Sequence, residues 1–336
     1  MNTTLLPFDE NVQERTRPLY EKLSRFIPEV EWPLVAPLID EIRKLKVEKN
    51  AVILAHNYMT PDIFHGVADI VGDSLALARE AVNTTADVIV LCGVHFMAET
   101  AKILNPTKTV LIADLEAGCS LAESITAEDV RELRRLNPGV PIVTYVNTSA
   151  AVKAESDICC TSGNALAIVE SLPGDTVLMI PDRFLAANIA KQTKKKILTW
   201  EKGSCMVHDQ FTSKEIQALR KSYPGVTVMA HPECPTDVVA ASDYAGSTAQ
   251  MIDFVQKSHP KKVMLITECS MSDNVAAEFP EVEFIRPCNL CPHMKRITLP
   301  KILKCLQNMA PAVEVDQGIL PAARRAIDLM LAVKNK

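Results

Sequence analysis

The sequence carries one pattern three times, and this internal repeat restricts the fold more than any other feature. Three apolar runs rich in β-branched residues span 51–55, 142–146 and 226–230. Polar clusters follow them at His56, Asn147 and His231, which lie 91 and 84 residues apart. Because a fixed period of this kind is typical of repeated structural units, the chain predicts three related units.

Each unit adds a second apolar run, at 88–92, 176–180 and 262–266, and then a short run that leads to a cysteine. The cysteines are Cys119, Cys205 and Cys291, each 86 residues after the one before. Apolar strands that alternate with amphipathic helices are typical of parallel sheets covered on both faces. We therefore predict an α/β fold of three similar three-layer α/β/α domains with small parallel sheets, each of about four strands. We expect a pseudo-threefold arrangement around a central active site, since functional groups gather at the strand ends of such sheets.

The repeat also sets the expected domain boundaries. We expect an N-terminal extension over 1–36, a first α/β repeat over 37–127 and a second over 128–214. The third repeat covers 215–336 and includes a C-terminal helix. An apolar stripe within 311–336 predicts that this helix packs back on the body of the protein.

The composition is that of an ordinary globular protein, with 48% hydrophobic and 23% charged residues. The net charge is −5 with no block of like charge, so a nucleic-acid or membrane-surface role has no electrostatic support. Residues 1–17 are polar and lack the apolar centre of a signal peptide, and no apolar stretch is long enough to cross a bilayer. We therefore expect a cytoplasmic protein.

Ten cysteines is a high count, and in a reducing compartment they are not expected to form a disulfide framework. Cys92, Cys159, Cys269 and Cys305 stand among apolar residues and are interpreted as small core side chains. The three repeated cysteines differ, because each follows a strand end beside Gly or Pro. Core packing alone does not explain that placement, although recurrent α/β packing without any function remains the alternative.

Three thiolates from three units suit a metal centre. Zinc is disfavoured because only Cys288 and Cys291 have the close C-x2-C spacing that zinc sites prefer. An electron-transfer cluster uses four cysteines, whereas a cluster with three keeps one iron open as a Lewis acid. The pattern therefore favours a dehydration catalyst over an electron carrier.

Polar side chains at the strand ends supply the rest of a site. The candidates are His56, Asn57, Tyr58, Ser74, Tyr145, Asn147, Ser162, His231, Glu233, Ser247 and Thr248. Tyr and Glu serve proton transfer when buried near charge, and hydroxyls at helix starts bind carboxylate or phosphate oxygens. No G-x-G-x-x-G or P-loop motif is present, which disfavours nicotinamide and ATP chemistry. His208 follows Cys205 by three residues and is a weaker candidate for a group that supports a metal ligand.

These motifs together resemble the quinolinate synthase A family, the iron–sulfur enzymes of NAD biosynthesis. The matching segments run in family order over roughly residues 37 to 335: 55–58, 72–74, 96–101, 118–120, 145–148, 160–162, 231–234, 246–248 and 291–295. The resemblance implies a condensation of iminoaspartate with dihydroxyacetone phosphate that gives quinolinate, phosphate and water. It also implies a 4Fe–4S cluster with three cysteine ligands, which map onto Cys119, Cys205 and Cys291.

The resemblance also assigns roles. Proton transfer and substrate positioning map onto Tyr58, Tyr145, Glu233 and His231. Binding of carboxylate or phosphate oxygens maps onto His56, Ser74, Asn147, Ser162, His231 and Thr248. The open iron is implied to bind the pyridine precursor as a Lewis acid, and iminoaspartate is implied to come by handover from L-aspartate oxidase.

One departure concerns the third cysteine segment. Some family members carry C-x2-C-x2-C there, whereas Ile285 occupies the first of those positions here and leaves Cys288 and Cys291. A reversible Cys288–Cys291 disulfide is one reading, and Cys288 as a residue beside the site is the one we favour. Two functional alternatives also stay open: another cluster-dependent hydro-lyase acting on a small carboxylate, and a non-catalytic iron–sulfur redox sensor.

Overall fold

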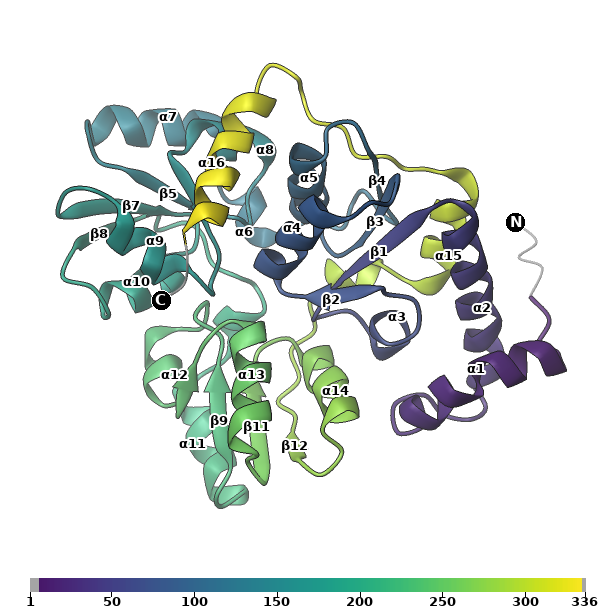
Figure 1. The fold of residues 1–336 in the computed structure, drawn as a ribbon. Helices are drawn as coiled ribbons and strands as arrows, with labels where there is room; N and C mark the ends of the chain where they lie inside the picture. Colours follow the sequence, from purple (N-terminus) through teal and green to yellow (C-terminus); the bar gives the residue numbers. More distant parts are fainter. Residues whose placement is uncertain (1–5, 334–336) are drawn as a thin grey trace.

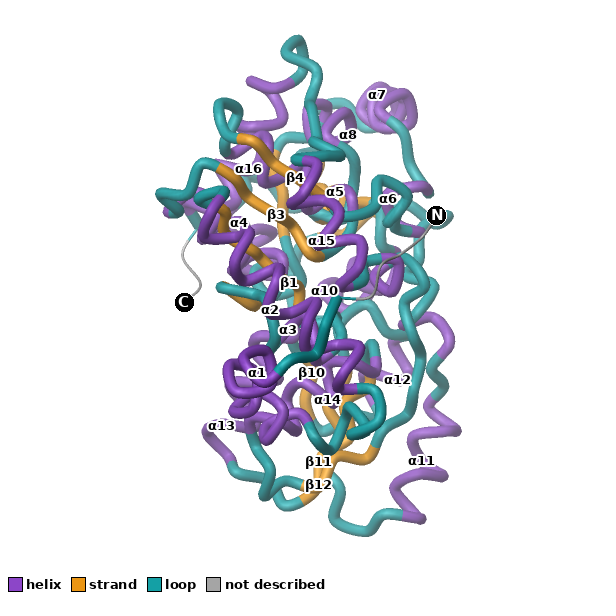
Figure 2. The backbone as a smooth tube through the Cα atoms, turned by 90° about the vertical axis from the view of Figure 1, so that its right-hand side faces the viewer, coloured by secondary structure: helices purple, strands orange, loops and turns teal. Residues whose placement is uncertain are grey.

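Three four-stranded parallel sheets form the framework of the protein in the computed structural model, which describes residues 6–333 (Figure 1). All three sheets have the same topology: the second strand of the unit lies at one edge, followed by the first, third and fourth. Every strand pair is parallel. Helices flank each sheet, so the predicted α/β fold with three small parallel sheets is confirmed (Figure 2).

Each sheet and its helices form one unit, and the units are numbered in chain order. The first unit contains α2 (Trp32–Glu48), β1 (Ala51–His56), α3 (Pro61–Phe64), β2 (Ile70–Gly72), α4 (Ser74–Asn83), β3 (Val88–Cys92), α5 (His95–Leu104), β4 (Thr109–Ile112) and α6 (Ser120–Glu123). The second contains α7 (Ala127–Leu136), β5 (Ile142–Tyr145), α8 (Ala150–Glu155), β6 (Ile158–Cys160), α9 (Ala165–Ser171), β7 (Thr176–Ile180), α10 (Arg183–Ala190), β8 (Lys196–Thr199) and the 3₁₀ helix η1 (His208–Gln210). The third contains α11 (Ser213–Ser222), β9 (Thr227–Ala230), α12 (Thr236–Ala240), β10 (Tyr244–Ala245), α13 (Thr248–Ser258), β11 (Lys262–Ile266), α14 (Cys269–Glu278), β12 (Glu283–Ile285) and the 3₁₀ helix η2 (Met294–Arg296).

The repeat extends to a polar contact at the start of each sheet. An aspartate just before the edge strand accepts a hydrogen bond of 2.8 Å from a backbone N–H of the first strand in all three units. The pairs are Asp69 with Ile53, Asp157 with Ile142, and Asp243 with Val228. Each aspartate also forms an ion pair with a basic residue of the helix that precedes the first strand of its unit. These residues are Lys46, Arg134 and Arg220, and the nitrogen–oxygen distances are 2.6, 3.2 and 2.9 Å. The three units therefore share an electrostatic anchor as well as a strand order.

The N-terminal helix α1 (Glu10–Leu23) packs on α2 of the first unit. The rings of Tyr20 and Trp32 lie 4.9 Å apart, and the Arg15 guanidinium bonds the buried Asp40 carboxylate at 2.6 and 2.8 Å. Most of the segment expected to be an extension is thus a helix held against the body. Residues 1–5 lie outside the described part of the chain.

After the third unit, the chain returns to the other two. Helix α15 (Leu299–Asn308) packs on α2 and β4 of the first unit, and residues 311–313 run antiparallel beside β4. Helix α16 (Leu320–Ala332) packs on α8 and β6 of the second unit (Figure 1, yellow). The helix is shorter than the apolar pattern over 311–336 predicts, since the antiparallel segment occupies its first residues; 334–336 are not described. This C-terminal segment connects all three units.

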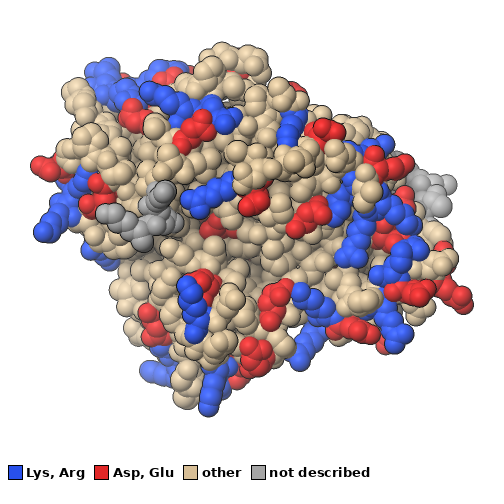
Figure 3. Space-filling view, in the orientation of Figure 1, with Lys and Arg blue, Asp and Glu red and all other residues tan. Residues whose placement is uncertain are grey.

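The described residues include no helix both long and apolar enough to span a membrane. On the face drawn in Figure 3, lysines and arginines are interspersed with aspartates and glutamates.

Candidate active site

One cavity of about 70 Å³, open to solvent, lies where the three units meet. Its walls include most of the residues that the sequence nominated for the site: His56, Tyr58, Ser74, Cys119, Tyr145, Asn147, Ser162, Cys205, His231, Glu233, Thr248 and Cys291. Asn57 and Ser247, which the sequence also nominated, are buried and do not line it. Apolar side chains such as Val94, Phe96 and Met97 complete the walls. A cavity with a few convergent polar groups among apolar walls is typical of a small-molecule site.

The strand ends deliver these side chains. His56 is the last residue of β1, Tyr145 is the last of β5, and His231 directly follows β9. Ser74 and Thr248 are the first residues of α4 and α13, where free backbone N–H groups can also face an anion. The same positions of three sheets therefore line one cavity.

The two strand-end histidines share a local geometry. The backbone N–H of Tyr58 points at Nδ1 of His56 at 3.2 Å, and the backbone N–H of Glu233 points at Nδ1 of His231 at 3.3 Å. Because Nδ1 accepts in each case, the proton of the neutral ring resides on Nε2. Burial lowers the pKa of His56 to about 4 and that of His231 to about 3, so both rings are neutral near pH 7.

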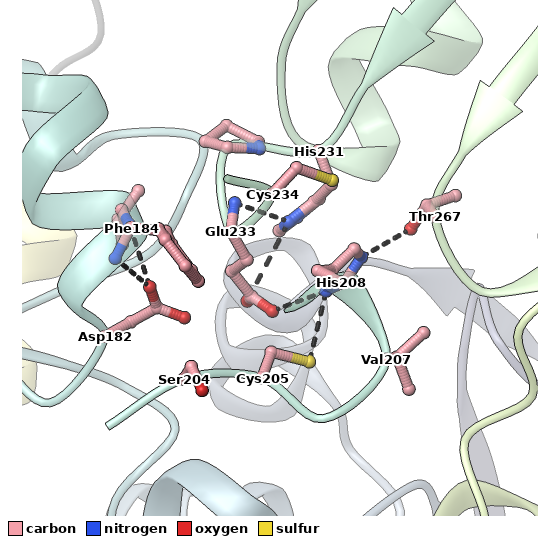
Figure 4. A network of polar contacts seen from close by, with 12 residues as sticks. Asp182, Phe184, Ser204, Cys205, Val207, His208, His231, Glu233, Cys234 and Thr267 are labelled. Carbon is pink, nitrogen blue, oxygen red and sulfur yellow. Dashed lines mark hydrogen bonds and ion pairs between the residues drawn. The ribbon is translucent and has the colours of Figure 1, made fainter. Parts of the chain in front are cut away.

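A buried chain of polar contacts joins the two catalytic tyrosine candidates. The Tyr58 hydroxyl lies 2.5 Å from Oγ1 of Thr267, and that oxygen lies 2.9 Å from Nε2 of His208. Nδ1 of His208 lies 2.8 Å from Oε2 of Glu233 (Figure 4). The other oxygen of Glu233 accepts a hydrogen bond from the Tyr145 hydroxyl. A carboxylate only accepts, so Nδ1 of His208 carries the proton and Nε2 accepts from Thr267. The donors therefore run in one direction, from Tyr58 to Glu233.

The ionisation states follow from burial and from this chain. Burial opposes the charge of Glu233, but His231, His208 and the hydrogen bond from Tyr145 together hold its pKa well below the usual range. Burial and the nearby Glu233 charge raise the pKa of both Tyr58 and Tyr145 well above their ordinary value. The site thus pairs one buried carboxylate with two protonated phenols, which is an arrangement suited to proton transfer.

The three repeated cysteines differ from the other free thiols that the structure describes. Cys119, Cys205 and Cys291 are partly exposed and line the cavity, whereas the remaining free cysteines are buried. The backbone N–H groups two and three residues after each one stabilise its thiolate: those of residues 121 and 122, 207 and 208, and 293 and 294.

Burial nevertheless raises the pKa of all three thiols, that of Cys119 to about 12. Deprotonation here therefore needs a bound cation. Amide hydrogen bonds to sulfur are a known means of tuning cluster thiolates, so the three residues fit an iron–sulfur centre.

A smaller metal-binding group overlaps this set. The ligand atoms of Cys205, His208 and Glu233 all lie within 4.8 Å of one another. A single ion bound there would leave Cys119 and Cys291 without a role. It would also break the contact between His208 and Glu233 on which the polar chain depends.

Sequence reasoning missed Thr267 and gave His208 too small a part in the site. Thr267 directly follows β11, in the place that Gly93 takes after the equivalent strand β3. The rule that functional residues lie at strand ends could therefore have identified it. His208 was a weak candidate for supporting a metal ligand. Its Nδ1 lies 3.1 Å from Sγ of Cys205, and it is the centre of the polar chain.

One interpretation of the cysteines was wrong. Cys269 is buried, but it forms a disulfide with Cys288 and is not a simple core thiol. Cys291 remains free. The disulfide considered from the sequence, between Cys288 and Cys291, is therefore not the one that the structure contains.

The fold and the cavity define a class of protein: an α/β enzyme of three repeated units, with three thiols and a buried carboxylate–histidine pair at one small-molecule site. Comparison with known proteins gives the particular family. Residues 40–332 match the family described as Quinolinate synthetase A protein. The chain belongs to this family.

Individual relatives agree over nearly the whole chain. Quinolinate synthase 2 of Mesorhizobium japonicum is 65% identical over 315 residues, covering 94% of this chain and 97% of that protein. Quinolinate synthase of Sinorhizobium fredii is 59% identical over 330 residues, covering 98% and 92%. Quinolinate synthase of Xylella fastidiosa is 65% identical over 295 residues, covering 88% and 87%.

Proposed function

We propose that the protein is a quinolinate synthase of NAD biosynthesis that condenses iminoaspartate with dihydroxyacetone phosphate. The products are quinolinate, phosphate and two waters, so the reaction balances without an external oxidant or reductant. Family membership supports this proposal. The single observation that carries it is that three repeated thiols and a directed proton chain meet at one cavity.

Cys119, Cys205 and Cys291 would hold a 4Fe–4S cluster in this proposal. A cluster with three protein ligands supplies an open iron that acts as a Lewis acid toward a carboxylate, nitrogen or hydroxyl oxygen of the substrate. The redox balance of the reaction requires acid chemistry of this kind and no electron transfer.

Proton transfers fall to Tyr58, Tyr145 and Glu233. The ionised Glu233 is the acceptor at one end of the chain, and Tyr58 is the donor at the other. When Tyr58 takes a proton from the substrate at its hydroxyl oxygen, its own hydroxyl proton passes to Thr267, the Thr267 proton to Nε2 of His208 and the Nδ1 proton of His208 to Glu233, so the tyrosine can serve as a base without solvent. Tyr145 donates to Glu233 and holds that carboxylate in place.

The anionic groups of the two substrates would be bound by neutral donors. The Nε2–H groups of His56 and His231 are donors at neutral pH, as argued above. The hydroxyls of Ser74, Ser162 and Thr248 and the amide of Asn147 supply the remaining hydrogen bonds to carboxylate and phosphate oxygens. Neutral donors suit this task, since a fixed positive charge would hold the phosphate product after the reaction.

The remaining assignments are also proposals. The domain boundaries at residues 36, 127 and 214 are consistent with the three sheets, and a cytoplasmic location agrees with a cluster that oxygen destroys. Because an imine hydrolyses in water, we propose that iminoaspartate reaches the cavity by handover from L-aspartate oxidase.

The test is product formation under strict anaerobiosis. The purified protein is incubated with iminoaspartate and dihydroxyacetone phosphate, and quinolinate and phosphate are quantified. We expect equal amounts of both from the parent, a loss of about 100-fold in Glu233→Gln, and no change in the exposed control Glu201→Gln. An iron–sulfur protein that yields no quinolinate would overturn the proposal in favour of a different hydro-lyase or a sensor.

A further inference from the structure

An ion pair beside the cavity links two parts of the site that come from different units. Nζ of Lys295, in η2, lies 2.9 Å from Oε1 of Glu268, which precedes α14. Glu268 is fully buried and Lys295 is 21% exposed. Burial of an ionised carboxylate costs free energy unless its partners replace the lost hydration. The contacts of this pair therefore indicate which parts of the site it holds.

The ammonium group of Lys295 is fully used. Besides Glu268, it donates to the backbone carbonyl of Tyr58 at 2.7 Å and to Oγ of Ser270 at 2.7 Å. Three donors meet three acceptors, which leaves no freedom for the ammonium to adopt another position. The Tyr58 turn belongs to the first unit, so this contact crosses to the third.

Neighbouring carbonyls of the same turn are held in the same way. The side-chain amide of Asn274 in α14 donates to the carbonyls of Asn57 and Met59, at 3.1 and 2.7 Å. Helix α14 also packs on α3 across this boundary (Figure 1). Three consecutive carbonyls around Tyr58 are therefore bound by side chains of the third unit.

The carboxylate of Glu268 faces the cysteine segment. Its Oε1 accepts the backbone N–H of Cys291 at 3.4 Å, and its Oε2 accepts the N–H of Ser270 at 2.9 Å. Asn289 also lies beside Glu268 in a parallel bridge. One ion pair thus touches the backbone of a catalytic candidate on one side and the backbone of a cluster-ligand candidate on the other.

We propose that Lys295 and Glu268 form a positioning pair that fixes the Tyr58 turn and the Cys291 segment relative to each other. This inference rests on the proposed function, which gives Tyr58 and Cys291 their roles. Neither member of the pair lines the cavity, so neither is a catalytic residue. The pair acts through the two residues that it holds, and a displacement of either by 1 Å is enough to reduce turnover about 100-fold.

The variants are Lys295→Met, Lys295→Arg and Glu268→Gln, with Lys301→Met as the matched control. Lys301 of α15 also forms an ion pair with a carboxylate, Asp114 of the first unit at 2.6 Å, but touches neither Tyr58 nor Cys291. We expect Lys295→Met to lower kcat about 100-fold while KM changes less than about threefold. Lys295→Arg should recover most of the activity, and Lys301→Met should match the parent.

A double-mutant cycle separates positioning from general stability. If Lys295 acts through Tyr58, Lys295→Met should cost less than about threefold in kcat when Tyr58→Phe is already present. Lys301→Met should behave additively in both backgrounds. Additive costs for Lys295→Met and Tyr58→Phe would overturn the proposal.

A second measurement, the rate of cluster loss, does not depend on catalytic activity. Cluster loss in air, followed by visible absorbance without substrate, should be several-fold faster in Glu268→Gln and unchanged in Tyr58→Phe and Lys301→Met. Equal rates in all variants would refute the role of Glu268. The parent assayed alongside distinguishes the two claims: if it makes no quinolinate, the proposed function fails, whereas an active parent with unaffected pair variants refutes only the positioning pair.

Discussion

Thr267 offers the sharpest test of the polar chain, because it contributes a single hydroxyl and does not line the cavity. Replacing it with valine keeps the side-chain shape and removes both contacts, at 2.5 Å to Tyr58 and 2.9 Å to His208. The direct contact that remains between the Tyr58 hydroxyl and Nε2 of His208 is 3.5 Å, the outer limit of a hydrogen bond. The variant therefore interrupts the chain at one defined point.

The expected magnitudes follow from these contacts. Two buried polar groups, the Tyr58 hydroxyl and Nε2 of His208, lose a partner, which costs about 3 kcal/mol of folding free energy. Loss of the relay between Tyr58 and Glu233 should lower kcat about 100-fold, whereas KM should change less than about threefold. Thr267→Ser is the matched control: it loses a buried methyl group, worth about 1 kcal/mol, but keeps the hydroxyl and should retain kcat within about threefold.

The assay is anaerobic quinolinate formation at saturating substrate, with iron content and urea unfolding measured on the same samples. Both variants are destabilised, so only kcat distinguishes a relay from simple packing. A fully cluster-loaded Thr267→Val enzyme with the kcat of the parent would refute the reasoning.

Three further results are expected. His231 has a folded pKa of about 3 against an ordinary 6.5, so its neutral state contributes stability above pH 6.5 that is lost as the pH falls. The loss of unfolding free energy between pH 7 and 5 in urea should be about 2 kcal/mol smaller in His231→Gln than in the parent, to which His56 also contributes, and an equal pH dependence in both proteins would contradict this. Asp157→Ala, which removes the strand anchor of the second unit, should cost about 2 kcal/mol in urea unfolding but leave kcat within about twofold, whereas a large loss of kcat would place that anchor in the site. Peptide mapping of cluster-free protein treated with oxidised glutathione should find the disulfide of Cys269 with Cys288 and an alkylatable Cys291, and a Cys288–Cys291 peptide would overturn this pairing.

The sequence predicted the fold and the cavity because both depend on features repeated along the chain. Apolar runs of strand length mark the sheets, and their ends must lie at one edge of each parallel sheet. His56, Tyr145 and His231 were found for this reason, and the regular spacing of Cys119 and Cys205 drew attention to the thiols.

Residues that occur only once escaped prediction. Thr267 is one threonine after an apolar run, and nothing local reveals that Tyr58, 209 positions earlier, lies against it. The same holds for Lys295, whose partners Glu268 and Tyr58 come from other segments of the chain. Local sequence encodes strands and helices, whereas contacts between units depend on how the three sheets meet.

The pairing of Cys269 shows the same limit. Its apolar neighbours predicted a core thiol, and its burial agrees with that. Only the approach of the Cys288 segment to the start of α14 makes a disulfide geometrically feasible, with the two Cα atoms 4.9 Å apart.

A count of iron and sulfide is the direct test of whether three cysteines from three units hold one cluster. The parent, Cys119→Ser, Cys205→Ser and Cys291→Ser are purified anaerobically, with the buried thiol variant Cys305→Ser as control. We expect about four irons and four sulfides per chain in the parent and the control, and loss of both in each of the three variants. A parent without iron, or three variants that keep it, would show that these cysteines do not hold a cluster.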